Sequence, residues 1–230
     1  MSDNPLTFDY NFIFEDRRKL HFPIRLHPVH LTLINDNPES KADWARLENS
    51  QCKNCTLRTE SYPYCPIAQN LVNILSEFND VYSYEQVKVI IKTQERTYSK
   101  KCSVQNGLGA MLGIIMVSTS CPIMSRLKPM VRFHLPFASV QETISKSVGS
   151  YLLGQYFKHK DGKTADWDLN GLKALYKEIQ TVNYGMAARL RSASSKDANV
   201  NALIILDIFA KEMPEKIDDS LKMLKYLYEE

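Results

Sequence analysis

The sequence predicts an α+β fold, in which an N-terminal β-hairpin-rich part with a cysteine metal site packs on a C-terminal helical bundle. Three observations lead to this prediction. Apolar residues alternate with polar ones at 6–14 and again at 20–26, which is typical of half-buried strands. From about residue 103 onward the apolar residues recur at helical spacing. Between these regions, the stretch QCKNCTLRTESYPYCP at 51–66 holds three cysteines.

The alternation at 6–14 and 20–26 predicts a β-hairpin. The polar run EDRRK at 15–19 supplies the turn between its two strands. Pro23 has no N–H to give to a neighbouring strand, so we expect the second strand at an edge of the sheet. One face of the first strand should be buried, because aromatic residues occupy every second position: Phe8, Tyr10, Phe12 and Phe14.

The next elements follow from periodicity and turn signals. The run NDNPES at 35–40 should end the first β pattern. A helix is expected at 67–78, where apolar residues lie three and four positions apart, and β-branched residues predict a second hairpin at 86–99. A further helix is expected at roughly 104–119.

The C-terminal part is predicted to be helical throughout. Ser139 and Glu142 have the spacing of a capping box and should begin one helix. Three more helices are expected: about 168–190, an almost wholly apolar one at 201–210, and a last one opened by Pro214. The prediction divides the chain into a β-rich, cysteine-bearing region at 1–102 and a helical bundle at 103–230, or joins both in one integrated domain.

Composition and charge narrow the class of protein. The chain of 230 residues carries a net charge of +3, well short of that of a dedicated nucleic-acid coat protein. The opening MSDNPLTFDY lacks the regions of a signal peptide, and the most apolar stretch, at 108–117, is too short to cross a bilayer. We therefore expect a cytoplasmic protein without membrane association, whose thiols stay reduced and bind metal or lie buried.

The clustered cysteines predict a zinc site. Cys52 and Cys55 form a Cys-x2-Cys pair, a short turn that points two sulfurs at one tetrahedral centre, and Cys65 can close on the same point. A closed site takes four ligands, and we expect Cys121 to be the fourth. Cys65 and Cys121 both precede proline, so each is predicted to cap a helix whose dipole favours a thiolate.

Other ligands and uses of these cysteines stay open. Cys102 or His134 could replace Cys121 as the fourth ligand. Four cysteines with Cys-Pro steps could also hold an iron–sulfur cluster, although their spacing matches no ferredoxin pattern. If protein sulfurs fill all four positions, no place remains for water or substrate, which favours a structural over a catalytic metal.

A nucleic-acid surface is the second alternative. Basic residues could form one face around the cysteines, with tyrosines available for stacking. These residues are Lys100, Lys101, Arg126, Lys128 and Arg132, with Tyr62, Tyr64 and Tyr98. No catalytic triad, paired carboxylate motif or phosphate-binding loop stands out, because GLGAMLG at 107–113 has its third glycine one position late.

The order of several motifs resembles an uncharacterised bacterial family, a domain of unknown function. The motifs are CKNC, YCPIAQNLV, STSCP, KPMVRFHLPF, DWDLNGL and DANVNAL, which together extend over most of the chain. The resemblance implies no activity and no catalytic residues. It includes both Cys-Pro steps and leaves Cys102 outside the pattern.

Together these observations predict a zinc-stabilised cytoplasmic binding or adaptor protein with a structural four-cysteine site and no evident catalytic centre. An unknown protein partner is expected. A nucleic-acid-binding protein and an iron–sulfur redox protein are the alternatives.

Overall fold

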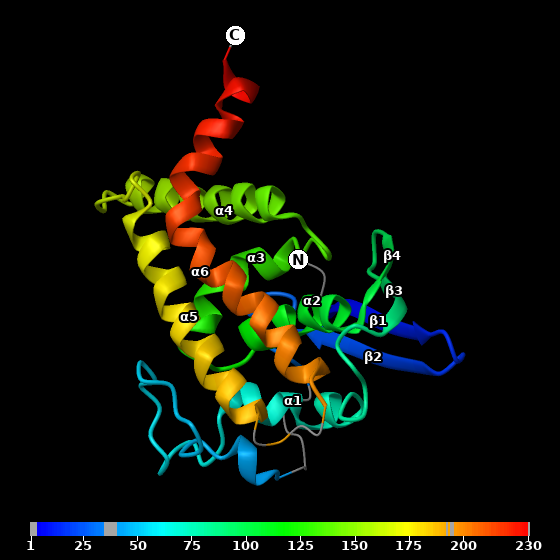
Figure 1. Ribbon diagram of the computed structural model, residues 1–230. Coiled ribbons are helices and arrows are strands. Elements are labelled where there is room, and N and C mark those ends of the chain that lie inside the picture. The colour runs from blue at the N-terminus through cyan, green and yellow to red at the C-terminus, as the bar shows by residue number, and fades with distance from the viewer. Residues whose placement is uncertain (1–3, 35–40, 192, 194–195, 230) are drawn as a thin grey trace.

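A four-stranded antiparallel sheet and a helical layer make up the fold in the computed structural model (Figure 1), which describes residues 4–34, 41–191, 193 and 196–229. The strands are β1 (Leu6–Phe14), β2 (Lys19–Leu26), β3 (Gln86–Lys92) and β4 (Thr97–Ser103). The α-helices are α1 (Pro66–Ser76), α2 (Val104–Val117), α3 (Lys128–Arg132), α4 (Val140–Lys160), α5 (Asn170–Arg191) and α6 (Ala198–Leu224). Short 3-10 helices are η1 (Asp43–Ala45), η2 (Met124–Leu127) and η3 (Lys225–Tyr228). The α+β class is thus confirmed.

Both predicted hairpins are present, and the strand order is β2-β1-β3-β4. Pro23 lies on β2, which is an edge strand, as its missing N–H requires. The aromatic face of β1 is buried, with Tyr10 paired to Ile91 and Phe12 to Val89 across the β1–β3 ladder. The predicted break at 35–40 lies outside the described residues.

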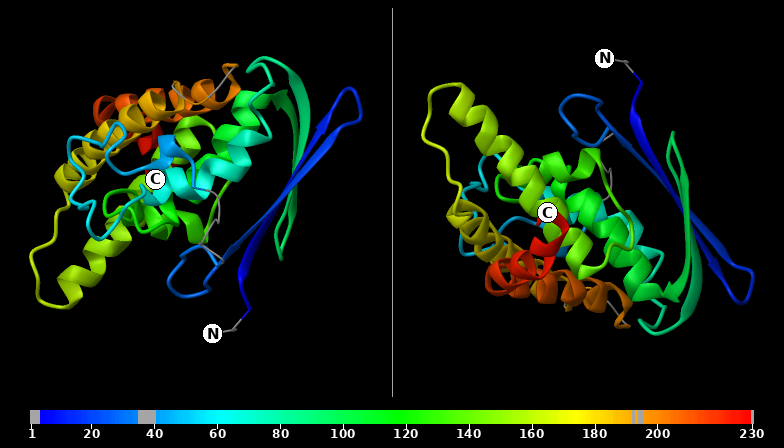
Figure 2. Two further views of the ribbon diagram at one scale, coloured as in Figure 1. Left: turned by 90° about the horizontal axis from the view of Figure 1, so that it is seen from below. Right: turned by 90° about the horizontal axis from the view of Figure 1, so that it is seen from above.

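The sheet is covered on one face, and all the helices lie on that side (Figure 2). The helix α2 packs directly on the sheet, where a Cβ on Gly107 would come within 2.7 Å of Val89 and 2.9 Å of Phe12. Glycine is needed here because any side chain would push the helix off the strands. Within the GLGAMLG stretch, Gly107 thus allows α2 to pack closely on the sheet.

The helical layer continues from α2 through α6 to α5, so α6 has neighbours on two sides. Buried apolar side chains form one cluster that includes the sheet and these helices. The capping box of α4 is confirmed, because Glu142 N–H donates to Ser139 Oγ at 3.2 Å and Ser139 N–H donates to Glu142 Oε2 at 2.7 Å. Among the described residues, no helix has the length and apolarity needed to cross a membrane.

The end of the chain differs from the prediction in one respect. Pro214 does not begin a separate helix, since α6 runs unbroken from Ala198 to Leu224 with this proline inside it. A proline in a helix interior costs about 3 kcal/mol through a lost hydrogen bond and a steric clash. Met213 and Ile217, buried on either side of it, offset this cost by packing into the core. The predicted apolar helix at 201–210 is also only partly buried, because Ile208 remains 51% exposed.

Candidate metal centre

The Cys-x2-Cys pair lies on a loop whose two ends are hydrogen-bonded together. Cys65 N–H donates to the carbonyl of Ala45 at 2.8 Å, and Leu47 N–H donates to the carbonyl of Pro63 at 2.9 Å. These bonds hold Cys65 at the base of the loop. We call residues 45–65 the cysteine loop.

Cys52 and Cys55 are joined by a tight turn, in which Cys55 N–H donates to the Cys52 carbonyl at 2.9 Å. The Cys52 thiol faces α5, with Sγ 3.9 Å from the carbonyl oxygen of Val182. A Cβ on Gly185 would lie 2.7 Å from this sulfur, so a side chain there would displace it. The loop and α5 therefore meet closely at Cys52.

The two Cys-Pro steps take different forms. Cys65 is the N-cap of α1 with Pro66 at the first position, as the sequence predicts. Cys121 does not cap an α-helix, because a turn and the short η2 follow it. Backbone N–H groups of Ile123 and Met124 nevertheless hydrogen-bond to the Cys121 sulfur and partly counter the rise that burial causes in its pKa.

All five cysteines are free thiols, and the pKa values of Cys52 and Cys121 respond to other cysteines. Burial, and next a charge on Cys65, raise the pKa of Cys52 to about 12, with Cys121 and Cys55 acting in the same direction. Cys121 likewise responds to Cys65 and Cys55. Burial is the largest cause of the shift for both thiols. Within the described residues, no group of three or more histidine, cysteine, aspartate or glutamate side chains is arranged to hold a metal ion.

Cys102 and His134, the alternative fourth ligands, lie in other surroundings. Cys102 is buried on β4, where its pKa is raised by burial and lowered by Lys100 and the backbone of Gly107. His134 follows α3, and its Nε2 lies 3.1 Å from Tyr10 Oη.

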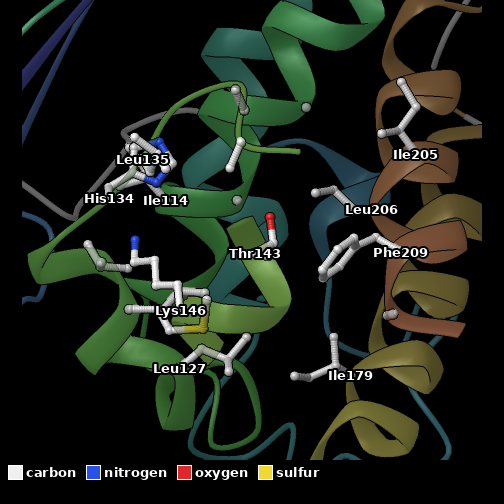
Figure 3. Close-up of a pocket in the computed structure, with 18 of the residues that line it drawn as sticks. Ile114, Leu127, His134, Leu135, Thr143, Lys146, Ile179, Ile205, Leu206 and Phe209 are labelled. Atoms are coloured by element: carbon white, nitrogen blue, oxygen red, sulfur yellow. The ribbon is translucent and has the colours of Figure 1, made fainter. Parts of the chain in front are cut away.

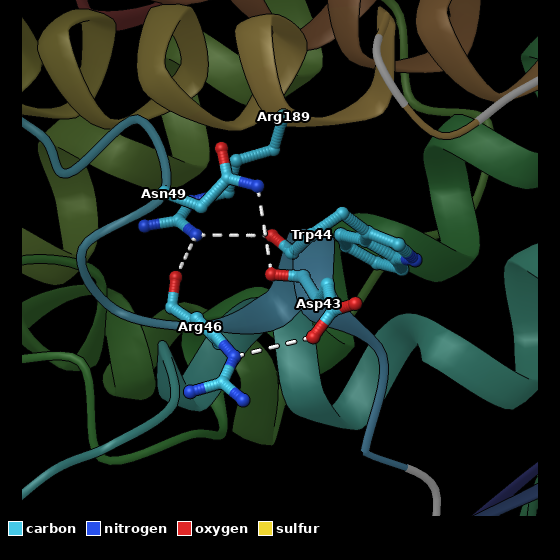
Figure 4. A network of polar contacts seen from close by, with 5 residues as sticks. All are labelled: Asp43, Trp44, Arg46, Asn49 and Arg189. Atoms are coloured by element: carbon cyan, nitrogen blue, oxygen red, sulfur yellow. Dashed lines mark hydrogen bonds and ion pairs between the residues drawn. The ribbon is translucent and has the colours of Figure 1, made fainter.

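One buried cation holds the cysteine loop to α5, and sequence analysis assigned it no such role. Arg189 is fully buried and donates from Nη1 to the carbonyls of Trp44 and Arg46 (Figure 4). Its Nη2 donates to the carbonyl of Leu47. Its positive charge also lowers the pKa of Cys52, against the effect of burial. A signal was available, since Arg189 lies three positions after Met186 on the apolar stripe of a predicted helix.

The basic residues proposed for nucleic-acid binding are partly engaged in other contacts. Lys101 forms an ion pair with Glu15, and Arg126 forms one with Glu178. Lys100 lies over the ring of Phe137, with Nζ 5.6 Å from its centroid. These contacts reduce the positive charge that the surface offers to phosphates.

His134 makes stability depend on pH. Burial, and next the charge of Lys146, lower the pKa of His134 from 6.5 to about 3. The unfolded chain therefore binds one more proton between these two values, and stability that is present above the unfolded pKa is lost as the pH falls. From about pH 7 to about pH 5 the free energy of unfolding should fall by about 2 kcal/mol through this group.

Denaturant titrations at the two pH values test this prediction with His134→Gln, in which the decrease should be smaller by that amount. The exposed His159 provides the control, because His159→Gln should keep the wild-type pH dependence. An equal decrease in wild type and His134→Gln would contradict the assignment.

Fold and site together define an α+β protein in which a cysteine-bearing surface loop packs against α5 of the helical layer. The chain belongs to the family DUF6901, described as a domain of unknown function, whose model matches residues 8–229. No curated protein and no solved structure matches the chain.

Proposed function

We propose that this protein is a zinc-stabilised binding or adaptor protein, in which Cys52, Cys55, Cys65 and Cys121 hold one structural zinc ion. The observation that carries the proposal is the tight turn that joins Cys52 to Cys55, on the same loop whose base holds Cys65. The pKa of Cys52 also responds to Cys121, which lies in the turn after α2. A zinc ion there would cross-link the loop to the helical layer, and its binding free energy would add to the stability of the fold.

The surroundings of the sulfurs suit thiolate ligands. Cys65 lies at the start of α1, where the helix dipole favours negative charge, and two amide N–H groups reach Cys121. Arg189 adds a buried positive charge near Cys52. Without metal, burial keeps Cys52 protonated at neutral pH, so zinc binding would release its proton and exchange the contact with Val182 for a metal bond.

A binding role is favoured by the end of α6, which projects beyond the other helices together with η3 (Figure 1). Large apolar side chains are exposed on this projection: Met223, Tyr226, Leu227 and Tyr228. Aromatic side chains in such positions are common in protein interfaces. An adaptor that presents them to a protein partner in the cytoplasm fits this arrangement.

Elemental analysis of the freshly purified protein, with an absorbance spectrum, tests the proposal. We expect about one zinc ion per chain, the number that four ligands can hold, and no visible absorbance. Iron with a brown colour would instead identify the iron–sulfur alternative. Protein without bound metal would refute both forms of the site. Nucleic-acid affinity that falls steeply with salt would favour the nucleic-acid alternative.

A further inference from the structure

A pocket of about 390 Å³ lies on the helical side of the sheet, apart from the cysteine loop. Its walls come mainly from α2, η2, α4, α5 and α6, together with the segment after α3. This volume falls at the lower end of the roughly 300–1,000 Å³ typical of small-molecule sites. Most of the lining is apolar and includes Ile114, Leu127, Ile179, Leu206 and Phe209.

Two of the polar side chains that line the pocket lie on the same side of it. Figure 3 shows Lys146 and His134 together, with Leu206 and Phe209 of α6 on the opposite side and Thr143 between them. Lys100 is the second cation of the lining. No aspartate or glutamate of the described residues lines this pocket, so its only charges are positive.

Lys146 is a half-buried cation that no described carboxylate pairs with. Burial alone lowers the pKa of Lys146 from 10.5 to about 8. A cation is costly in such a place unless an anion accompanies it. The pocket therefore places the positive charge of Lys146, which could pair with an anionic ligand, next to apolar walls.

A second polar group in the pocket also has room for a partner. Asn183 on α5 is 2% exposed and lines the pocket, one helical turn after Ile179. Its Oδ1 is buried without a hydrogen-bond partner among the described residues. Buried polar groups in proteins are nearly always hydrogen-bonded, which favours a ligand that brings a polar atom to this wall.

We infer that this pocket binds a free amphipathic carboxylic acid, whose carboxylate pairs with Lys146 and whose apolar body lies against α5 and α6. Thr143 can donate a hydrogen bond to the same carboxylate, and a hydroxyl on the apolar body would satisfy Asn183. This inference rests on the binding role proposed above and names its ligand class. It does not require the zinc ion.

Calorimetric titration with decanoate tests the inference, with decanol as the uncharged comparison and each compound kept monomeric. Wild-type protein should bind one decanoate and bind decanol about ten-fold more weakly or worse, because decanol cannot form the charge-assisted hydrogen bond to Lys146. Lys146→Gln should lose about ten-fold or more in affinity for decanoate and little for decanol. Lys146→Arg should retain most of the affinity, and Lys158→Gln, an exposed site on the same helix, should match wild type.

The pH dependence gives an independent readout. Decanoate affinity should weaken as the pH rises through about 8, where Lys146 loses its proton. The other titratable groups facing the pocket are Lys100, His134 and Tyr176. His134 and Tyr176 do not change charge near pH 8. Burial lowers the pKa of His134 to about 3 and raises the pKa of Tyr176 to about 12.

Three results would overturn the inference: no decanoate binding, equal affinity for decanoate and decanol, or Lys146→Gln that binds decanoate as wild type does. Zinc content is measured on the same samples. Zinc-containing protein that ignores decanoate would refute the ligand and leave the metal proposal standing. Zinc-free protein that binds decanoate would refute the metal proposal and leave the ligand inference standing.

Discussion

Cys121→Ser is expected to lose its zinc and to unfold more easily than the wild-type protein. A serine hydroxyl is a poor zinc ligand, and the binding free energy of a structural zinc counts as folding free energy. We expect the free energy of unfolding to fall by about 4 kcal/mol, the range reached when a metal is lost. For a chain of this length that corresponds to a Tm lower by roughly 10 °C.

Cys102→Ser is the matched control for this change, since Cys102 is equally buried but lies on β4. It should keep its zinc and lose about 1 kcal/mol, the usual effect of a point substitution. Zinc content and thermal unfolding of both variants are measured beside the wild type. If Cys121→Ser keeps its metal and its Tm, residue 121 is not a ligand.

Arg189→Met should destabilise the protein by about 3–5 kcal/mol, because each hydrogen bond from a charged donor is worth about 1.5–3 kcal/mol and several would be lost. Methionine fills much of the same space, but the carbonyls of Trp44, Arg46 and Leu47 would lose the guanidinium that they share. The cysteine loop would then separate more easily from α5. Hydrogen exchange within the loop should therefore speed up more than exchange in the sheet.

The exposed Arg191, two positions further along α5, supplies the control. Arg191→Met should change the unfolding free energy by no more than about 0.5 kcal/mol. Arg189→Lys should recover only part of the loss, because an ammonium cannot reproduce the forked geometry of the guanidinium. Denaturant unfolding at one fixed zinc concentration compares the variants. Stability of Arg189→Met within about 1 kcal/mol of wild type would contradict the role of Arg189.

Local patterns in the sequence were enough for most elements of the fold. The alternation around Phe12 predicts β1 and its buried face, and Ser139 with Glu142 predicts the start of α4. Pro214 misled the prediction, because local propensity cannot include the tertiary packing of Met213 and Ile217 that keeps α6 continuous.

The order of the strands and the pocket depended on contacts between distant parts of the chain. The pairing of β1 with β3 joins residues about eighty positions apart, which no short pattern encodes. In the sequence, Lys146 and Asn183 look like ordinary helix residues. Only the tertiary fold shows that both line the same pocket. The cysteine spacing, in contrast, was visible at once, because Cys52, Cys55 and Cys65 are close in sequence.

Zinc K-edge X-ray absorption on the purified protein is the most direct test of the four-cysteine site. Four thiolates around one zinc ion predict a single shell of four sulfur atoms at about 2.3 Å. A shell that includes nitrogen or oxygen atoms, or a sample without zinc, would contradict it.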